Sequence, residues 1–140
     1  MGDHDTYGKA VLRQAAGAAF VDWGAAVEVR YGKARGASID GVVSGSIAVE
    51  IESRVSKQVR GAVLDLICHR CPKKLLVLIP VHMSNVELCA DQCRDILGRF
   101  IGSADFRVVV LHGSGFKDAL AADQAAVLTA LSELGFNGAA

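Results

Sequence analysis

The stretch IDGVVSGSIAVEIE, residues 39–52, decides the fold expected for this chain. Two runs of β-branched residues flank a Ser-Gly-Ser turn, which is the pattern of a β-hairpin. A three-residue loop pairs Val43 with Ile47 and sets Gly41 opposite Val49. In this register the apolar residues share one face: Ile39, Val43, Ile47, Val49 and Ile51. A two-residue loop divides them between the two faces, so the three-residue loop is expected.

The same register brings three acidic side chains together. Asp40 lies directly across from Glu50, with Cβ atoms about 5 Å apart. Glu52 follows on the same face, roughly 7 Å further along the strand. Two like charges about 5 Å apart cost on the order of 3 kcal/mol at an effective dielectric of about 20. Something must therefore offset the repulsion between these carboxylates.

Two interpretations of the acidic cluster stay open at this point. Oxygen-only ligands from one or two carboxylates suit Mg²⁺, which keeps several of its waters. Alternatively, Arg30, Arg54 or Lys57 forms ion pairs with the acids, and the cluster is purely structural.

The rest of the chain alternates between helical and strand patterns. The patterns predict helices over residues 6–23, 54–70, 84–101 and 117–134, and strands over 25–31, 74–81 and 106–112. Ser84 and Glu87 have the spacing of a capping box at the third helix. Tightly joined strands should be antiparallel, whereas strands separated by a helix should be parallel. The prediction is one α/β domain over residues 1–140, a mixed central sheet flanked by helices in the order α-β-β-β-α-β-α-β-α.

This order, with Asp40 on one strand and Glu50-Ile51-Glu52 on the next, resembles the PD-(D/E)xK nuclease superfamily. Restriction endonucleases, Holliday-junction resolvases and repair nucleases belong to it. The resemblance covers residues 7–80 and implies a restriction-endonuclease-like fold and a Mg²⁺-dependent DNA endonuclease, with Mn²⁺ able to substitute. It implies that Asp40 and Glu50 bind the metal. Glu52 stands at the position of the family lysine, as a third catalytic and metal-binding acid, and the first helix offers no glutamate as a further ligand.

Basic residues follow the acidic strand directly. Arg54, Lys57, Gln58 and Arg60 stand at the start of the predicted helix 54–70, where a phosphate group would approach. Lys33 and Arg35, in the flexible turn 32–36, are further candidates for contact with the DNA backbone. A solvated helix face explains the first group equally well.

Cleavage of both DNA strands by subunits with one site each requires a pair, so we expect a homodimer. The rival interpretation is a nuclease fold that has lost its chemistry and binds nucleic acid or protein. A third possibility is a small-molecule α/β domain centred on His82, His112 and the loop 113–115. Both histidines follow predicted parallel strands, so they should emerge at the edge of the sheet where α/β folds bind ligands.

The four cysteines have a spacing near that of a zinc ribbon: Cys68, Cys71, Cys89 and Cys93. Cys89 and Cys93 lie on the apolar stripe of a predicted helix, and a strand more than about 20 Å long separates the two pairs. We therefore expect no zinc site.

Composition limits the class of protein. Fifteen basic and fifteen acidic residues give zero net charge, which argues against non-specific attraction to nucleic acid or anionic membranes but leaves room for a local basic patch. No apolar run approaches the roughly 18 residues of a membrane span. Acidic residues near the amino terminus are unlike a signal peptide, so we expect a cytoplasmic protein with reduced thiols and no membrane partner.

Overall fold

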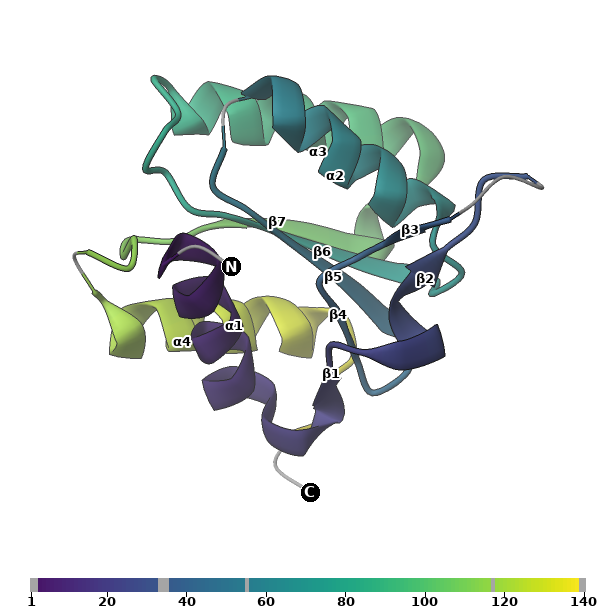
Figure 1. Cartoon of the computed structure of the whole chain (residues 1–140), viewed down its shortest axis with the longest axis horizontal. Coiled ribbons are helices and arrows are strands. Elements are labelled where there is room, and N and C mark those ends of the chain that lie inside the picture. Colours follow the sequence, from purple (N-terminus) through teal and green to yellow (C-terminus); the bar gives the residue numbers. More distant parts are fainter. Residues whose placement is uncertain (1–2, 33–35, 55, 117, 139–140) are drawn as a thin grey trace.

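The computed structural model describes residues 3–32, 36–54, 56–116 and 118–138. Five strands form a mixed sheet in the order β1-β4-β5-β6-β7, and helices cover both of its faces (Figure 1). The strands are β1 (Phe20–Val21), β4 (Gly41–Val43), β5 (Ile47–Glu52), β6 (Lys73–Leu78) and β7 (Phe106–Val110). The helices are α1 (Asp3–Ala16), α2 (Ser56–Cys68), α3 (Val86–Phe100) and α4 (Leu120–Glu133). The prediction of a mixed α/β sheet flanked by helices is confirmed.

Each face of the sheet has its own apolar core. Helices α1 and α4 pack on one face, where Leu12 and Leu131 belong to the same core as Val49 of β5. Helices α2 and α3 pack on the other face, where Leu66 and Leu97 belong to the second core. In Figure 1 these pairs form the layers below and above the sheet.

The hairpin has the predicted register. Val43 pairs with Ile47 and Gly41 with Val49, around a three-residue loop in which Ser44 and Gly45 take positive φ angles. Ile39, however, packs with the α2–α3 core and not on the face predicted for it. The reason is that β4 begins only at Gly41, and the backbone N–H of Ile39 donates to the carbonyl of Val27, 2.9 Å away.

The parallel part of the sheet fixes which edge carries the chain's polar loops. Strands β5, β6 and β7 are parallel, with Glu52 in register with Leu78, and Leu78 with Val110. The end of the Glu52 strand therefore lies at the same edge of the sheet as the loops that follow β6 and β7.

The segment before the hairpin departs from the prediction. Helix α1 ends at Ala16 and not near Trp23, because Gly17 takes a left-handed φ of 58°. A 3₁₀ turn (Gly17–Ala19) then leads into β1, which pairs with β4, and Trp23 is 75% exposed. The order of elements along the chain therefore contains a strand, β1, that the sequence did not predict.

The predicted strand 25–31 is also mostly absent. A second 3₁₀ turn occupies Gly24–Val27, and only β2 (Glu28–Val29) is extended. It pairs with β3 (Ala37–Ser38) in a separate two-stranded ribbon. Downstream of Gly41, each predicted helix and strand is present with bounds shifted by a few residues. The cap of α3 is Asn85 and not Ser84, since Asn85 Oδ1 accepts the N–H of Leu88 at 3.1 Å.

A third 3₁₀ turn (Ser103–Asp105) precedes β7. None of the helices in the described part of the chain has the length and apolar character that a membrane span requires.

Candidate functional site

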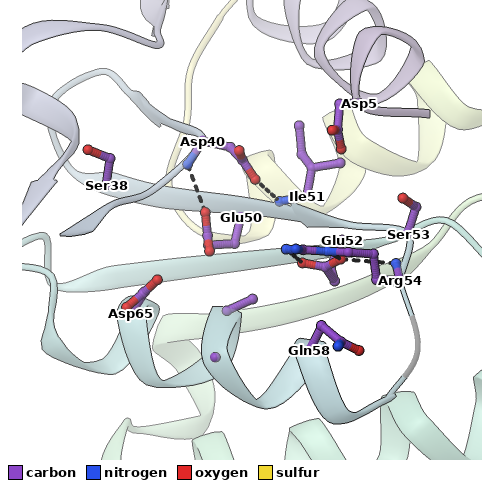
Figure 2. Close-up of a pocket in the computed structure, with 12 residues that line it drawn as sticks. Asp5, Ser38, Asp40, Glu50, Ile51, Glu52, Ser53, Arg54, Gln58 and Asp65 are labelled. Atoms are coloured by element: carbon purple, nitrogen blue, oxygen red, sulfur yellow. Dashed lines mark hydrogen bonds and ion pairs between the residues drawn. The ribbon is translucent and has the colours of Figure 1, made fainter. Parts of the chain in front are cut away.

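A polar pocket of about 410 Å³ lies beside the carboxyl end of β5 (Figure 2). It is lined by Asp5, Ser38, Asp40, Glu50, Ile51, Glu52, Ser53, Arg54, Gln58, Gly61, Ala62 and Asp65. Five of these side chains are carboxylic acids and one is a guanidinium. The pocket is thus an acidic environment, and a cation is the ligand that its charge favours.

Asp40 and Glu50 are held together just before the point where β4 begins. The backbone N–H of Asp40 donates to Glu50 Oε1 at 2.8 Å, and the backbone N–H of Ile51 donates to Asp40 Oδ2 at 2.6 Å. These bonds take the place of the next step of the β4–β5 ladder, so both carboxyl groups are fixed by the backbone. The predicted neighbourhood of these two acids is present.

Burial sets the protonation of this pair. Burial raises the pKa of Asp40 above its ordinary value. Burial, followed by the charge of Asp40, raises the pKa of Glu50 to about 9. Glu50 is 7% exposed and therefore carries a proton at neutral pH. Because a bound cation would replace that proton, the pair is suited to exchange one for the other.

Glu52 has a different environment from its neighbour. Its Oε1 accepts Arg54 Nε–H at 2.7 Å and the Arg54 backbone N–H at 2.9 Å, while its Oε2 accepts Arg54 Nη2–H at 2.9 Å. Burial raises the pKa of Glu52, but the bonds to Arg54 outweigh it and hold that pKa below its ordinary value. Glu52 is therefore ionised and paired within the chain. Arg30, a predicted alternative partner, lies 3.8 Å from Glu28 instead.

Two acids of the pocket were missed by the sequence prediction. Figure 2 shows Asp5 on the α1 side of β5 and Asp65 on the α2 side. The hydroxyl of Tyr31 donates to Asp65 Oδ1. A signal for Asp65 was present, because Gln58, Ala62 and Asp65 share one helical face. For Asp5 there was none, since its place depends on how α1 crosses the sheet.

The predicted phosphate-binding residues divide into groups. Arg54 and Gln58 line the pocket, and Lys57 is exposed in the first turn of α2. Arg60 borders a different cavity, described below. The predicted contacts of Lys33 and Arg35 with the DNA backbone fall outside the described residues.

The two predicted histidines do not join the acidic pocket. The His82 ring stacks edge-on to His4, with centroids 5.4 Å apart. The His112 side chain is exposed, while its backbone N–H donates to Asp123 Oδ1 at 2.7 Å. The Gly113 N–H donates to Asp123 Oδ2 at 2.8 Å. This loop therefore directs backbone donors to a carboxylate of its own chain, which leaves fewer of them for a small-molecule ligand.

No family model matches the chain, and searches of curated proteins and of solved structures find no match either. The resemblance to the PD-(D/E)xK superfamily therefore stays a prediction.

The donor set at Asp40 and Glu50 fits a hard divalent cation. Within residues 3–32, 36–54, 56–116 and 118–138, no group of three or more histidine, cysteine, aspartate or glutamate side chains is arranged to hold a metal ion. Two carboxylates with several waters, however, are an ordinary arrangement for Mg²⁺. Asp40 and Glu50 meet that requirement, whereas Glu52 is engaged by Arg54.

A second cavity, of about 990 Å³, lies between α2 and α3. Its walls are mainly apolar, and four exposed large hydrophobic residues lie on these helices: Leu64, Leu88, Ile96 and Phe100. Cys89 and Cys93 form part of its floor and are buried free thiols, as is Cys71, while Cys68 is an exposed free thiol. Patches of this kind on a surface commonly mark contacts with another protein.

Proposed function

We propose that this chain is a Mg²⁺-dependent DNA endonuclease of the PD-(D/E)xK type, which hydrolyses phosphodiester bonds. The observation that carries the proposal is the pair Asp40 and Glu50, a half-buried and a buried carboxyl group fixed side by side by backbone hydrogen bonds. Holding two acids in this way costs stability. A cation that binds both of them offsets this cost.

The residues of the chain have separate tasks in this proposal. Asp40 and Glu50 bind the cation, and Asp5 adds negative charge from α1. When bound, Mg²⁺ supplies charge stabilisation for the phosphate and a water that deprotonates readily. Before that, Glu50 gives up the proton it carries at neutral pH. The exposed Lys57, at the start of α2, contacts the DNA backbone.

The charge of the pocket affects how DNA binds. Glu50 carries a proton and Glu52 is paired with Arg54, but the other carboxylates of the pocket repel the phosphates of DNA. A cation held by Asp40 and Glu50 would reduce this repulsion. We therefore expect the affinity for DNA to rise when a divalent cation is present.

The direct test is incubation of supercoiled plasmid with the protein. We expect nicked and then linear DNA with Mg²⁺ or Mn²⁺, and intact plasmid when EDTA is added, because phosphodiester hydrolysis at this site depends on the cation. Gel electrophoresis over time reads out both products. Binding of DNA without cleavage in either metal supports the alternative, a catalytically inactive nuclease-fold module that binds nucleic acid or protein.

We also propose a homodimer formed through the α2–α3 face. The apolar cavity has Arg60 on its α2 side and Asp91 and Asp95 on its α3 side. Both acids pair within α3, with Arg94 and Arg99 respectively, and can accept further N–H donors. A twofold axis across this face sets Arg60 of each copy against the acids of the other, so the face is complementary to itself. The occupant that it fits is a second copy of the chain.

A single charge should separate the two copies. Leu64 is 53% exposed beside this cavity, so Leu64→Glu should introduce two buried, like charges near the axis and convert the dimer to a monomer. Light scattering after size-exclusion chromatography measures the mass. Leu128→Glu, on an exposed position of α4, is the matched control and should leave the mass unchanged. A wild-type mass of one chain at micromolar concentration contradicts the dimer.

The free cysteines support a cytoplasmic location, since thiols persist in that reducing compartment.

A further inference from the structure

We propose that Glu52 and Arg54 act as one unit, in which Glu52 positions the guanidinium of Arg54 to contact the phosphate that is cleaved. This inference rests on the proposed nuclease function. It gives Glu52 a task other than binding the metal or accepting a proton.

The two side chains form a fork-to-fork contact. Glu52 ends β5 with its side chain 6% exposed, whereas the Arg54 side chain is 68% exposed. Nε and Nη2 of Arg54 each donate to a different oxygen of Glu52, at 2.7 and 2.9 Å. Figure 2 shows the guanidinium lying along the Glu52 carboxylate. The buried partner thus fixes the direction of the exposed one.

Glu52 is poorly suited to the other roles. Both of its oxygens already accept hydrogen bonds from Arg54. Its Oε1 also accepts the backbone N–H of Arg54 at 2.9 Å, so these oxygens are already engaged within the chain. Asp40 and Glu50, by contrast, form a pair of adjacent carboxyl groups, and a bound cation would offset the repulsion between them.

Arg54 retains the capacity to bind a phosphate. A guanidinium carries more N–H donors than one carboxylate uses, and it does not lose its charge at any ordinary pH. Its planar fork matches the oxygens of a phosphate group. Because Arg54 lines the same pocket as Asp40 and Glu50, a phosphate that reaches the cation also reaches this side chain.

The Glu52–Arg54 pair also accounts for a glutamate at the position where the resembled nuclease family has a lysine. Glu52 stands where a lysine would place a positive charge at the end of the strand. Here the strand ends on the negative charge of Glu52, and the positive charge of Arg54 lies two residues later at the rim of the pocket. Arg54, held in place by Glu52, therefore supplies the positive charge that a lysine would otherwise offer to the phosphate.

The test separates this role from metal binding. Glu52→Gln and Arg54→Ala should both bind Mn²⁺ within about twofold of the wild type in calorimetry, whereas Asp40→Asn should lose that binding. Both variants should lose about 10²-fold in kcat for plasmid cleavage, the usual cost of one positioned donor. The double variant should be no slower than either single variant, because the two groups act together.

Two further measurements exclude a merely structural effect. Arg54→Lys should recover part of the lost kcat, and added guanidinium ion should partly rescue Arg54→Ala but not Asp40→Asn. Arg54 is exposed, so its variants should fold even if Glu52→Gln does not. Circular dichroism of each variant checks this.

Three outcomes decide the matter. Loss of Mn²⁺ binding by Glu52→Gln makes Glu52 a metal ligand and overturns the inference, and so does full cleavage by Arg54→Ala. In both cases the proposed function stands. A wild type that neither binds Mn²⁺ nor cleaves plasmid overturns the proposed function, and this inference with it.

Discussion

Glu50→Gln is expected to stabilise the protein at about pH 8 and, in the same variant, to abolish Mn²⁺ binding and DNA cleavage. Burial, and then the nearby Asp40 carboxylate, raise the pKa of Glu50 from 4.5 to about 9. Between these values the folded protein holds a proton that the unfolded chain has lost. The free energy of unfolding of the wild type therefore falls as the pH rises through this window, by up to about 1.4 kcal/mol per pH unit.

The glutamine variant has no proton to lose, and its Oε1 still accepts the Asp40 N–H. Its stability should therefore change less between about pH 5 and pH 8, with the largest gain over the wild type at the higher value. Denaturant unfolding at several pH values measures this. Glu87→Gln, an exposed position on α3, is the control and should follow the wild type.

Metal binding gives the second half of the prediction. Calorimetry with Mn²⁺ in buffers of different ionisation enthalpy should show that the wild type releases a proton on binding, because Glu50 must ionise. Glu50→Gln should neither bind nor release. A variant that is less stable than the wild type at about pH 8, or that binds Mn²⁺ equally well, contradicts the role assigned to Glu50.

Asp123→Ala is expected to destabilise the fold by about 3–5 kcal/mol, a large part of the stability of a typical domain. Asp123 is fully buried and accepts three hydrogen bonds, from the Tyr7 hydroxyl at 2.5 Å and from the backbone N–H groups of His112 and Gly113. The alanine variant leaves these donors without their acceptor. It also loosens the contact between α1 and α4.

Urea unfolding monitored by circular dichroism measures the loss. Asp118→Ala, an exposed acid just before α4, is the matched control and should change stability by less than about 0.5 kcal/mol. Burial, together with the hydrogen bond to Asp123, raises the pKa of Tyr7 to about 12. In Asp123→Ala the phenol should therefore ionise at lower pH in an absorbance titration. Equal stabilities of the two variants would show that Asp123 is dispensable.

Much of the fold follows from local pattern. The hairpin was predictable because a period of two residues and a Ser-Gly-Ser turn agree on one register. The strands β6 and β7 were predictable because runs of apolar residues suit strands covered on both faces. The segment 17–31 was not. Its alanines and valines fit several conformations, and its pairing with β4 is a contact that no local pattern encodes.

The site was predictable where one hairpin supplies it. Asp40 and Glu50 follow directly from the register. Arg54 was foreseen both as an ion-pair partner and as a phosphate contact, but the sequence does not say which acid it joins. Asp5 arrives from a helix packed on the other face of the sheet, so its position depends on tertiary structure alone.

The contact between α1 and α4 also has a consequence for synthesis of the chain. Tyr7 and Asp123 are bonded although 116 positions separate them. During translation, the apolar stripe of α1 stays exposed until α4 has been made. The hairpin, α2 and β6 follow one another in the chain, so they can pack together earlier. We expect the α2–α3 layer to form first and α1 to dock last. Because Asp5 lies on α1 and lines the acidic pocket, we expect this pocket to be incomplete in the nascent chain until α4 has been made and α1 has docked.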